Sequence, residues 1–86
     1  MLLYNESNKE VYMTVNYNRL WKLLIDLNMS KTELREKTGI TTNALAKMGR
    51  NENVSTEVLC KICNVLNCQV EDILEIVEDK TIGNVS

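Results

Sequence analysis

The 86-residue sequence contains no histidine, no proline and no phenylalanine, and only three glycines. The missing histidine removes the usual general base of a nucleophilic serine or cysteine. With so few glycines, the chain has no glycine-rich loop of the kind that binds phosphate groups of nucleotides. These absences argue against an enzyme, and we predict no catalytic residue.

Long apolar runs are also missing. No stretch approaches the about 18 residues needed to span a bilayer, and the N-terminus lacks the basic start and hydrophobic core of a signal peptide. The cysteine count of three is odd, which favours reduced thiols over a disulfide framework. We therefore expect a cytoplasmic protein with no membrane contact. Its length allows one domain, with no room for a separate ligand-sensing domain, and no small-molecule ligand is evident.

The three cysteines have the ligand-like spacing Cys60-x2-Cys63-x4-Cys68. A structural zinc site takes four ligands, and no histidine is present to complete the set. Cys63 also falls on the apolar stripe of an expected helix, and free cysteine is among the most commonly buried residues. We expect the cysteines to pack in the core, with no metal ion and no cofactor.

Charge is unevenly distributed, although the formal net charge is only −2. Residues 15–51 carry seven basic and three acidic side chains, whereas residues 52–86 carry two basic and seven acidic ones. The positive half suits a nucleic-acid partner, and the acidic half would lie away from the phosphates. The acidic residues near the C-terminal end are Glu71, Asp72, Glu75, Glu78 and Asp79. Their helical spacing predicts a solvated face rather than a catalytic carboxylate pair.

Residues 30–48 have the pattern of two short helices joined by a tight turn. Ser30 and Glu33 have the spacing of a capping box, which predicts the start of the first helix. Gly39 predicts its end, because the left-handed residue just beyond a helix favours glycine. Thr41 can then cap the second helix.

The second helix of this pair is amphipathic. Its apolar positions, which we expect to face inward, are Ala44, Leu45 and Met48. The outward positions are Thr42, Asn43, Ala46 and Lys47. This outward face is small, polar and singly basic, which suits an element that lies in a DNA major groove.

This pattern resembles the helix-turn-helix of the Cro/C1-type (Xre) transcriptional regulators. The matching core positions are Leu34, Gly39, Ile40, Leu45 and Met48. The resemblance extends over residues 16–77 through Val58, Leu59, Ile62, Cys63, Leu66, Asp72, Ile73 and Leu74. It implies an all-α, five-helix, lambda-repressor-like domain that binds double-stranded DNA.

The resemblance also implies roles for individual residues. By position in the family's motif, Thr42, Asn43 and Lys47 reach base edges, and Thr41 and Ala46 shape the contact. Phosphate contacts are expected from the rim of the motif, where helix amides and basic side chains favour anions. These rim residues are Ser30, Lys31, Arg50 and Asn51. For Arg19, Lys22 and Arg35, phosphate contact and a solvated surface role both stay open.

Three further helices are expected from apolar periodicity and caps, over residues 17–27, 55–66 and 70–77. The chain then divides into an arm or leader (residues 1–15), the helix-turn-helix domain (16–77) and a tail (78–86). Residues 10–15 alternate in a way that also favours a short strand, which would pair with residues 81–85 of the same chain or of a second copy. The alternative for both ends is disorder.

The sequence thus predicts a transcriptional regulator that binds a pseudo-palindromic operator as a homodimer, since one recognition helix makes few base contacts. Candidate pairing surfaces are Trp21 with Ile25, or the last helix and tail. Trp21 and Ile25 are otherwise expected to pack inside the domain. The alternative function is a protein-interaction module of the same fold, antitoxin-like or an accessory regulator, to which the acidic C-terminal half lends weight.

Overall fold

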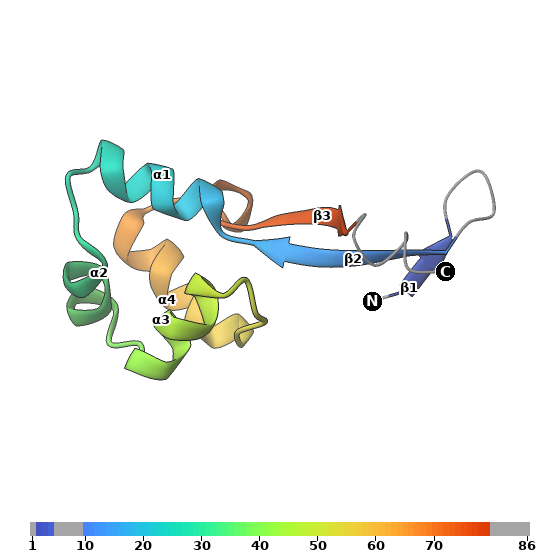
Figure 1. Ribbon diagram of the computed structural model, residues 1–86. Coiled ribbons are helices and arrows are strands. Elements are labelled where there is room, and N and C mark those ends of the chain that lie inside the picture. Colours follow the sequence, from blue (N-terminus) through green and yellow to red (C-terminus); the bar gives the residue numbers. More distant parts are fainter. Residues whose placement is uncertain (1, 5–9, 80–86) are drawn as a thin grey trace.

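The computed structural model describes residues 2–4 and 10–79 of the chain. In these ranges it contains four α-helices, one short 3-10 helix and a three-stranded antiparallel sheet (Figure 1). The helices are α1 (Asn18–Asp26), α2 (Lys31–Thr38), α3 (Thr42–Gly49) and α4 (Thr56–Leu66). The 3-10 helix is η1 (Val70–Asp72), and the strands are β1 (Leu2–Tyr4), β2 (Glu10–Asn16) and β3 (Glu75–Asp79).

Side chains that the sequence marks as caps begin and end the helices. The Ser55 hydroxyl accepts a hydrogen bond from the Val58 amide (3.2 Å) and starts α4, as expected. Asn28 and Asn67 follow α1 and α4 in left-handed conformations, with φ of 54° and 53°. Asparagine tolerates this conformation better than most residues, so these two positions end their helices without glycine.

The core lies between the four helices and the turn that follows α4. Its buried side chains are Tyr17, Leu20, Leu24, Leu34, Ile40, Ala44, Met48, Ile62 and Ile73. The apolar stripes that the sequence predicts supply most of them. The expectation for Trp21 and Ile25 is half correct, because Trp21 packs against this core and Ile25 is 77% exposed. Leu27, the last residue of the helix expected over residues 17–27, lies just beyond the end of α1 and is 49% exposed.

The prediction of a fifth helix over residues 70–77 is wrong. The chain forms only the turn η1 there, with Ile73 buried, and then continues as strand β3. Isolated helices of one or two turns are marginal in water, and the β-branched pair Ile76 and Val77 favours a strand once a partner strand is available. The fold is therefore helical with an added sheet rather than all-α.

The partner of β3 is the N-terminal strand β2, which confirms the strand expected over residues 10–15. The two strands are antiparallel, with Asn16 opposite Glu75 and Tyr12 opposite Asp79. The pairing expected with residues 81–85 falls outside the described residues, and the observed neighbours of β2 are β1 and β3. Figure 1 shows this ribbon extending away from the helices, with β2 leading directly into α1.

Candidate nucleic-acid interface

The helix-turn-helix expected at residues 30–48 is present, and its first helix is capped as predicted. The Ser30 hydroxyl accepts from the Glu33 amide (3.0 Å), and the Glu33 carboxylate accepts from the Ser30 amide (3.3 Å). At the other end, Gly39 adopts a φ of 74°, and its amide donates to the Arg35 carbonyl (2.9 Å). The turn to the next helix therefore depends on a glycine.

Helix α3 places its two faces as the sequence predicts. The Thr41 hydroxyl accepts from the Ala44 amide (3.0 Å) and caps the helix. Ala44 and Met48 are buried, and Leu45 packs against the core. The residues expected to meet bases lie on the other side: Thr41, Thr42, Asn43 and Ala46 are exposed, and Lys47 is half-buried. All five belong to one short segment of backbone that is fixed by a cap at its N-terminus.

At the N-terminal end of α2, both expected phosphate contacts already have partners within the chain. Glu33 occupies the Ser30 amide, so an anion approaching this helix end meets a carboxylate already in place. The Lys31 ammonium lies 4.2 Å from the centre of the Trp21 ring, a cation–π contact. Because Lys31 remains exposed, the ring restrains its charge at the surface rather than burying it.

The loop after α3 has a Schellman geometry that the sequence did not indicate. Asn51 is left-handed, with φ of 58°, and its amide donates to the Met48 carbonyl (3.1 Å). The Glu52 amide donates to the Lys47 carbonyl (2.9 Å), which closes the motif. Asn51, an expected phosphate contact, therefore also ends α3.

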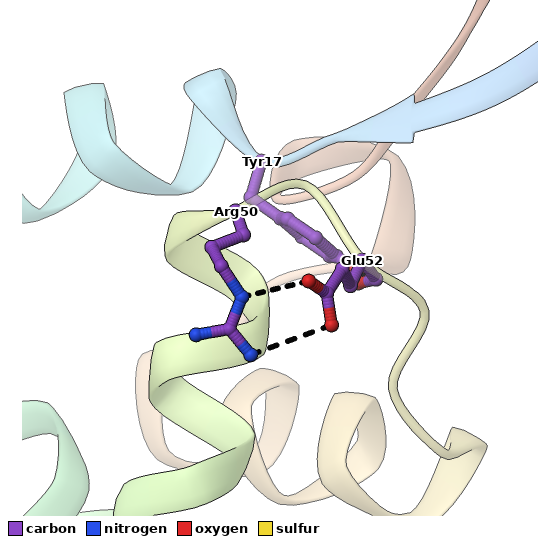
Figure 2. Close-up of polar contacts among 3 residues, drawn as sticks. All are labelled: Tyr17, Arg50 and Glu52. Carbon is purple, nitrogen blue, oxygen red and sulfur yellow. Dashed lines mark hydrogen bonds and ion pairs between the residues drawn. The ribbon is translucent and has the colours of Figure 1, made fainter.

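Arg50 forms an ion pair with Glu52, which sequence reasoning missed (Figure 2). The Nε atom of Arg50 lies 2.7 Å from Oε2 of Glu52, and Nη2 lies 3.4 Å from Oε1. This hydrogen bond from Arg50 is the main cause that holds the pKa of the Glu52 carboxyl below its usual value. Desolvation raises this pKa, whereas the positive charges of Arg50 and Lys47 lower it further. A carboxylate two residues after an arginine, in a loop, has no periodic pattern that would have revealed it.

Tyr17 ties this loop to the rest of the fold. Its hydroxyl donates a 2.6 Å hydrogen bond to the backbone carbonyl of Glu52, and its ring is 1% exposed (Figure 2). Burial raises the pKa of the Tyr17 hydroxyl. Since Tyr17 lies between β2 and α1, it connects the start of the helical domain to the end of α3.

The three basic residues whose role stayed open are placed differently. Arg19 donates to the Glu71 carbonyl (2.8 Å) and lies 3.9 Å from the Glu75 carboxylate, so it faces the acidic segment. Arg35 is half-buried and Lys22 is exposed. Arg19 is therefore directed away from the motif by its partners.

The cysteines do not gather as the spacing alone suggests. Cys63 and Cys68 are half-buried and pack against the core, as expected, whereas Cys60 is exposed, which is contrary to expectation. Burial, helped by neighbouring Cys63, raises the pKa of the Cys68 thiol to about 11. Within residues 2–4 and 10–79, no group of three or more cysteine and acidic side chains is arranged to hold a metal ion.

None of the helices in these described ranges has the length and apolar character of a bilayer-crossing segment.

Comparison with known proteins adds three findings. The family model of the Cro/C1-type HTH DNA-binding domain matches residues 19–79. The uncharacterized HTH-type transcriptional regulator YozG of Bacillus subtilis (strain 168) is 40% identical over 63 residues, which are 71% of this chain and 75% of that protein. The crystal structure of the transcriptional regulator VanUg is similar with a TM-score of 0.76 and 54% sequence identity, over 78% of this chain and 89% of that chain.

Proposed function

Because the chain belongs to the family of Cro/C1-type helix-turn-helix DNA-binding domains, we propose that it binds specific sequences of double-stranded DNA as a cytoplasmic transcriptional regulator. Helix α3 lies in the major groove, with its N-terminal residues toward the base edges. The family is one of transcriptional regulators and is typically non-enzymatic, which fits a role in binding without catalysis.

One observation carries this proposal: the outer face of α3 is exposed while its inner face is anchored in the core. Asn43 can make two hydrogen bonds to adenine, Lys47 can donate to guanine, and the Thr42 methyl can contact thymine. Thr41 and Ala46 border these three side chains and limit how closely the helix approaches. The sequence preference is assigned to these five residues.

Phosphate contacts are assigned to both ends of the motif. At the start of α2 the exposed Lys31 ammonium provides the charge, and Ser30, whose amide and hydroxyl serve in the cap, lies beside it. Arg50 and Asn51 follow α3. These residues fix the register of the protein on the duplex and contribute affinity for any sequence. The charge distribution supports this orientation, because residues 15–51 carry the excess of basic side chains.

Two copies are proposed to bind a pseudo-palindromic operator, with half-sites about 34 Å apart, since a single α3 offers few base contacts. A selection of binding sequences from a random DNA pool tests both parts of the proposal. We expect an enriched motif with two inverted half-sites. Enrichment of a single half-site would contradict binding as a homodimer. No enrichment at all would contradict sequence-specific recognition.

The alternative, a protein-interaction module of the same fold, is favoured by the acidic strand β3, in which three of five residues are carboxylates. A gel shift with random duplex DNA separates the two functions. DNA binding should weaken with salt, with log K falling by about 0.9 per phosphate neutralised for each unit of log salt concentration. No binding at low salt would favour the interaction module.

A further inference from the structure

Glu52 is an acidic side chain between two cations that are assigned to DNA contact. Its carboxylate bonds Arg50, and the charge of Lys47 also acts on it. A carboxylate near a duplex repels phosphates, so its place beside the recognition helix requires a reason. Stability is a weak one, because the side chains of Arg50 and Glu52 are 56% and 47% exposed, and exposed ion pairs stabilise folds little.

The backbone of Glu52 is held on both sides. Its amide donates to the Lys47 carbonyl (2.9 Å), and its carbonyl accepts from the Tyr17 hydroxyl (2.6 Å). Tyr17 itself is buried in the core. The carboxylate is therefore attached to a fixed point and not to a freely moving loop.

The carboxylate contacts one side of the Arg50 guanidinium. It accepts from Nε and Nη2, while Nη1 lies on the side away from Glu52 (Figure 2). A guanidinium is planar and carries five N–H donors, so one group can bond two anions at once. Glu52 thus leaves Arg50 able to bond a phosphate through Nη1 and the second Nη2 hydrogen.

We propose that Glu52 is a positioning residue for DNA binding: its anchored carboxylate holds the Arg50 side chain so that the Nη1 edge meets a backbone phosphate beside the end of α3. This inference rests on the proposed function. An arginine that is already held loses less conformational freedom when DNA binds. Tyr17 takes part indirectly, because it holds the backbone from which Glu52 extends.

The test is the substitution Glu52→Asp, which keeps the charge but shortens the side chain by one methylene. From the same backbone position, aspartate cannot reach both Nε and Nη2. We expect affinity for the selected DNA to fall about threefold to tenfold, because Arg50 is no longer held against its phosphate and that contact is lost. The slope of log K against log salt should become shallower by about 0.9, as one phosphate contact is lost.

A double substitution and a matched control complete the design. Arg50→Ala should reproduce the shallower slope, and adding Glu52→Asp to it should cause no further loss. The control is Glu57→Asp, because Glu57 forms a similar exposed ion pair with Lys61 on α4 (3.4 Å), outside the motif. It should bind DNA like the unsubstituted chain. Urea unfolding of each variant checks that all remain folded.

Each other outcome contradicts a particular step. If Glu52→Asp binds like the unsubstituted chain while Glu52→Gln binds more tightly, Glu52 only neutralises Arg50 and the positioning role is wrong. If Glu52→Asp weakens binding equally with and without Arg50, the effect does not act through Arg50. If the unsubstituted chain shows no salt-dependent DNA binding, the proposed function fails and this inference fails with it.

Discussion

The Tyr17 hydroxyl and the Glu52 carbonyl, 35 residues apart in the sequence, are joined by a 2.6 Å hydrogen bond. This bond connects the residue that precedes α1 to the loop that follows α3. Through it, the position of Arg50 depends on a side chain in the core as well as on its own helix.

Replacing Tyr17 by phenylalanine should lower the free energy of unfolding by about 1 kcal/mol, because the ring still fills its buried site but the Glu52 carbonyl loses its donor. Urea unfolding followed by circular dichroism measures the change. Tyr12→Phe is the control, since Tyr12 is 36% exposed, on the sheet. A stability equal to that of the unsubstituted chain would mean that the bond contributes nothing.

Replacement by alanine should change the stability of the fold in opposite directions at Gly39 and Gly49. Gly39→Ala should destabilise the fold by about 1 kcal/mol, because Gly39 has a φ of 74°, which costs an L-residue energy even where there is space. Gly49→Ala should stabilise it by about 0.5 kcal/mol, because Gly49 is helical and alanine favours helix. An added Cβ meets nothing within 4 Å at either position. Thermal unfolding of both variants tests the contrast, which fails if the two shift in the same direction.

Thiol reactivity should differ among the three cysteines. At pH 8 we expect Cys60, which is exposed, to react first with a disulfide reagent, and Cys68 to react slowly, because burial raises its pKa to about 11 and little thiolate forms. The pKa is higher in the fold than in the unfolded chain. The neutral Cys68 thiol therefore contributes fully to the stability of the fold below the unfolded pKa, and this contribution is lost as the pH rises toward 11. Mass spectrometry of peptides after timed labelling identifies each site, and equal rates in the folded protein would contradict the burial of Cys68.

Substitutions on α3 and at the start of α2 should separate specificity from affinity. Asn43→Ala should relax the preference at one base position, with a loss of discrimination of about 1–3 kcal/mol there. Lys31→Ala should weaken binding to all sequences alike and reduce the salt slope by about 0.9. Competition binding with single-base variants of the selected operator measures both effects. Unchanged preference in Asn43→Ala would mean that α3 meets DNA through a different face.

The helical part of this fold could be predicted from the sequence because its signals are local. Ser30, Thr41 and Ser55 each lie three residues before the amide that they bond, and Gly39 ends α2 where it stands. The faces of α3 followed from helical periodicity in the same way. These signals need no knowledge of distant parts of the chain.

The strand β3 could not be predicted, because its partner β2 is distant in the sequence: Asn16 pairs with Glu75 and Tyr12 with Asp79. Val70, Ile73, Leu74 and Val77 have helical spacing, so the local pattern favoured a helix. A strand becomes the more stable conformation of residues 75–79 only because β2 lies opposite them and pairs with them. The ion pair of Arg50 with Glu52 was missed for a different reason: it is local, but it depends on the left-handed turn at Asn51, which no periodic pattern indicates.

The register of the ribbon has a practical consequence for labelling. Tyr12 lies opposite both Leu2 and Asp79, so the two ends of the described chain are neighbours across a single strand. Figure 1 shows that β1 and the end of β3 both lie out along the sheet, away from α3. A dye attached at position 2 or 79 therefore stands clear of the surface assigned to DNA, and two dyes at these positions would lie close enough to report on each other through the single strand between them.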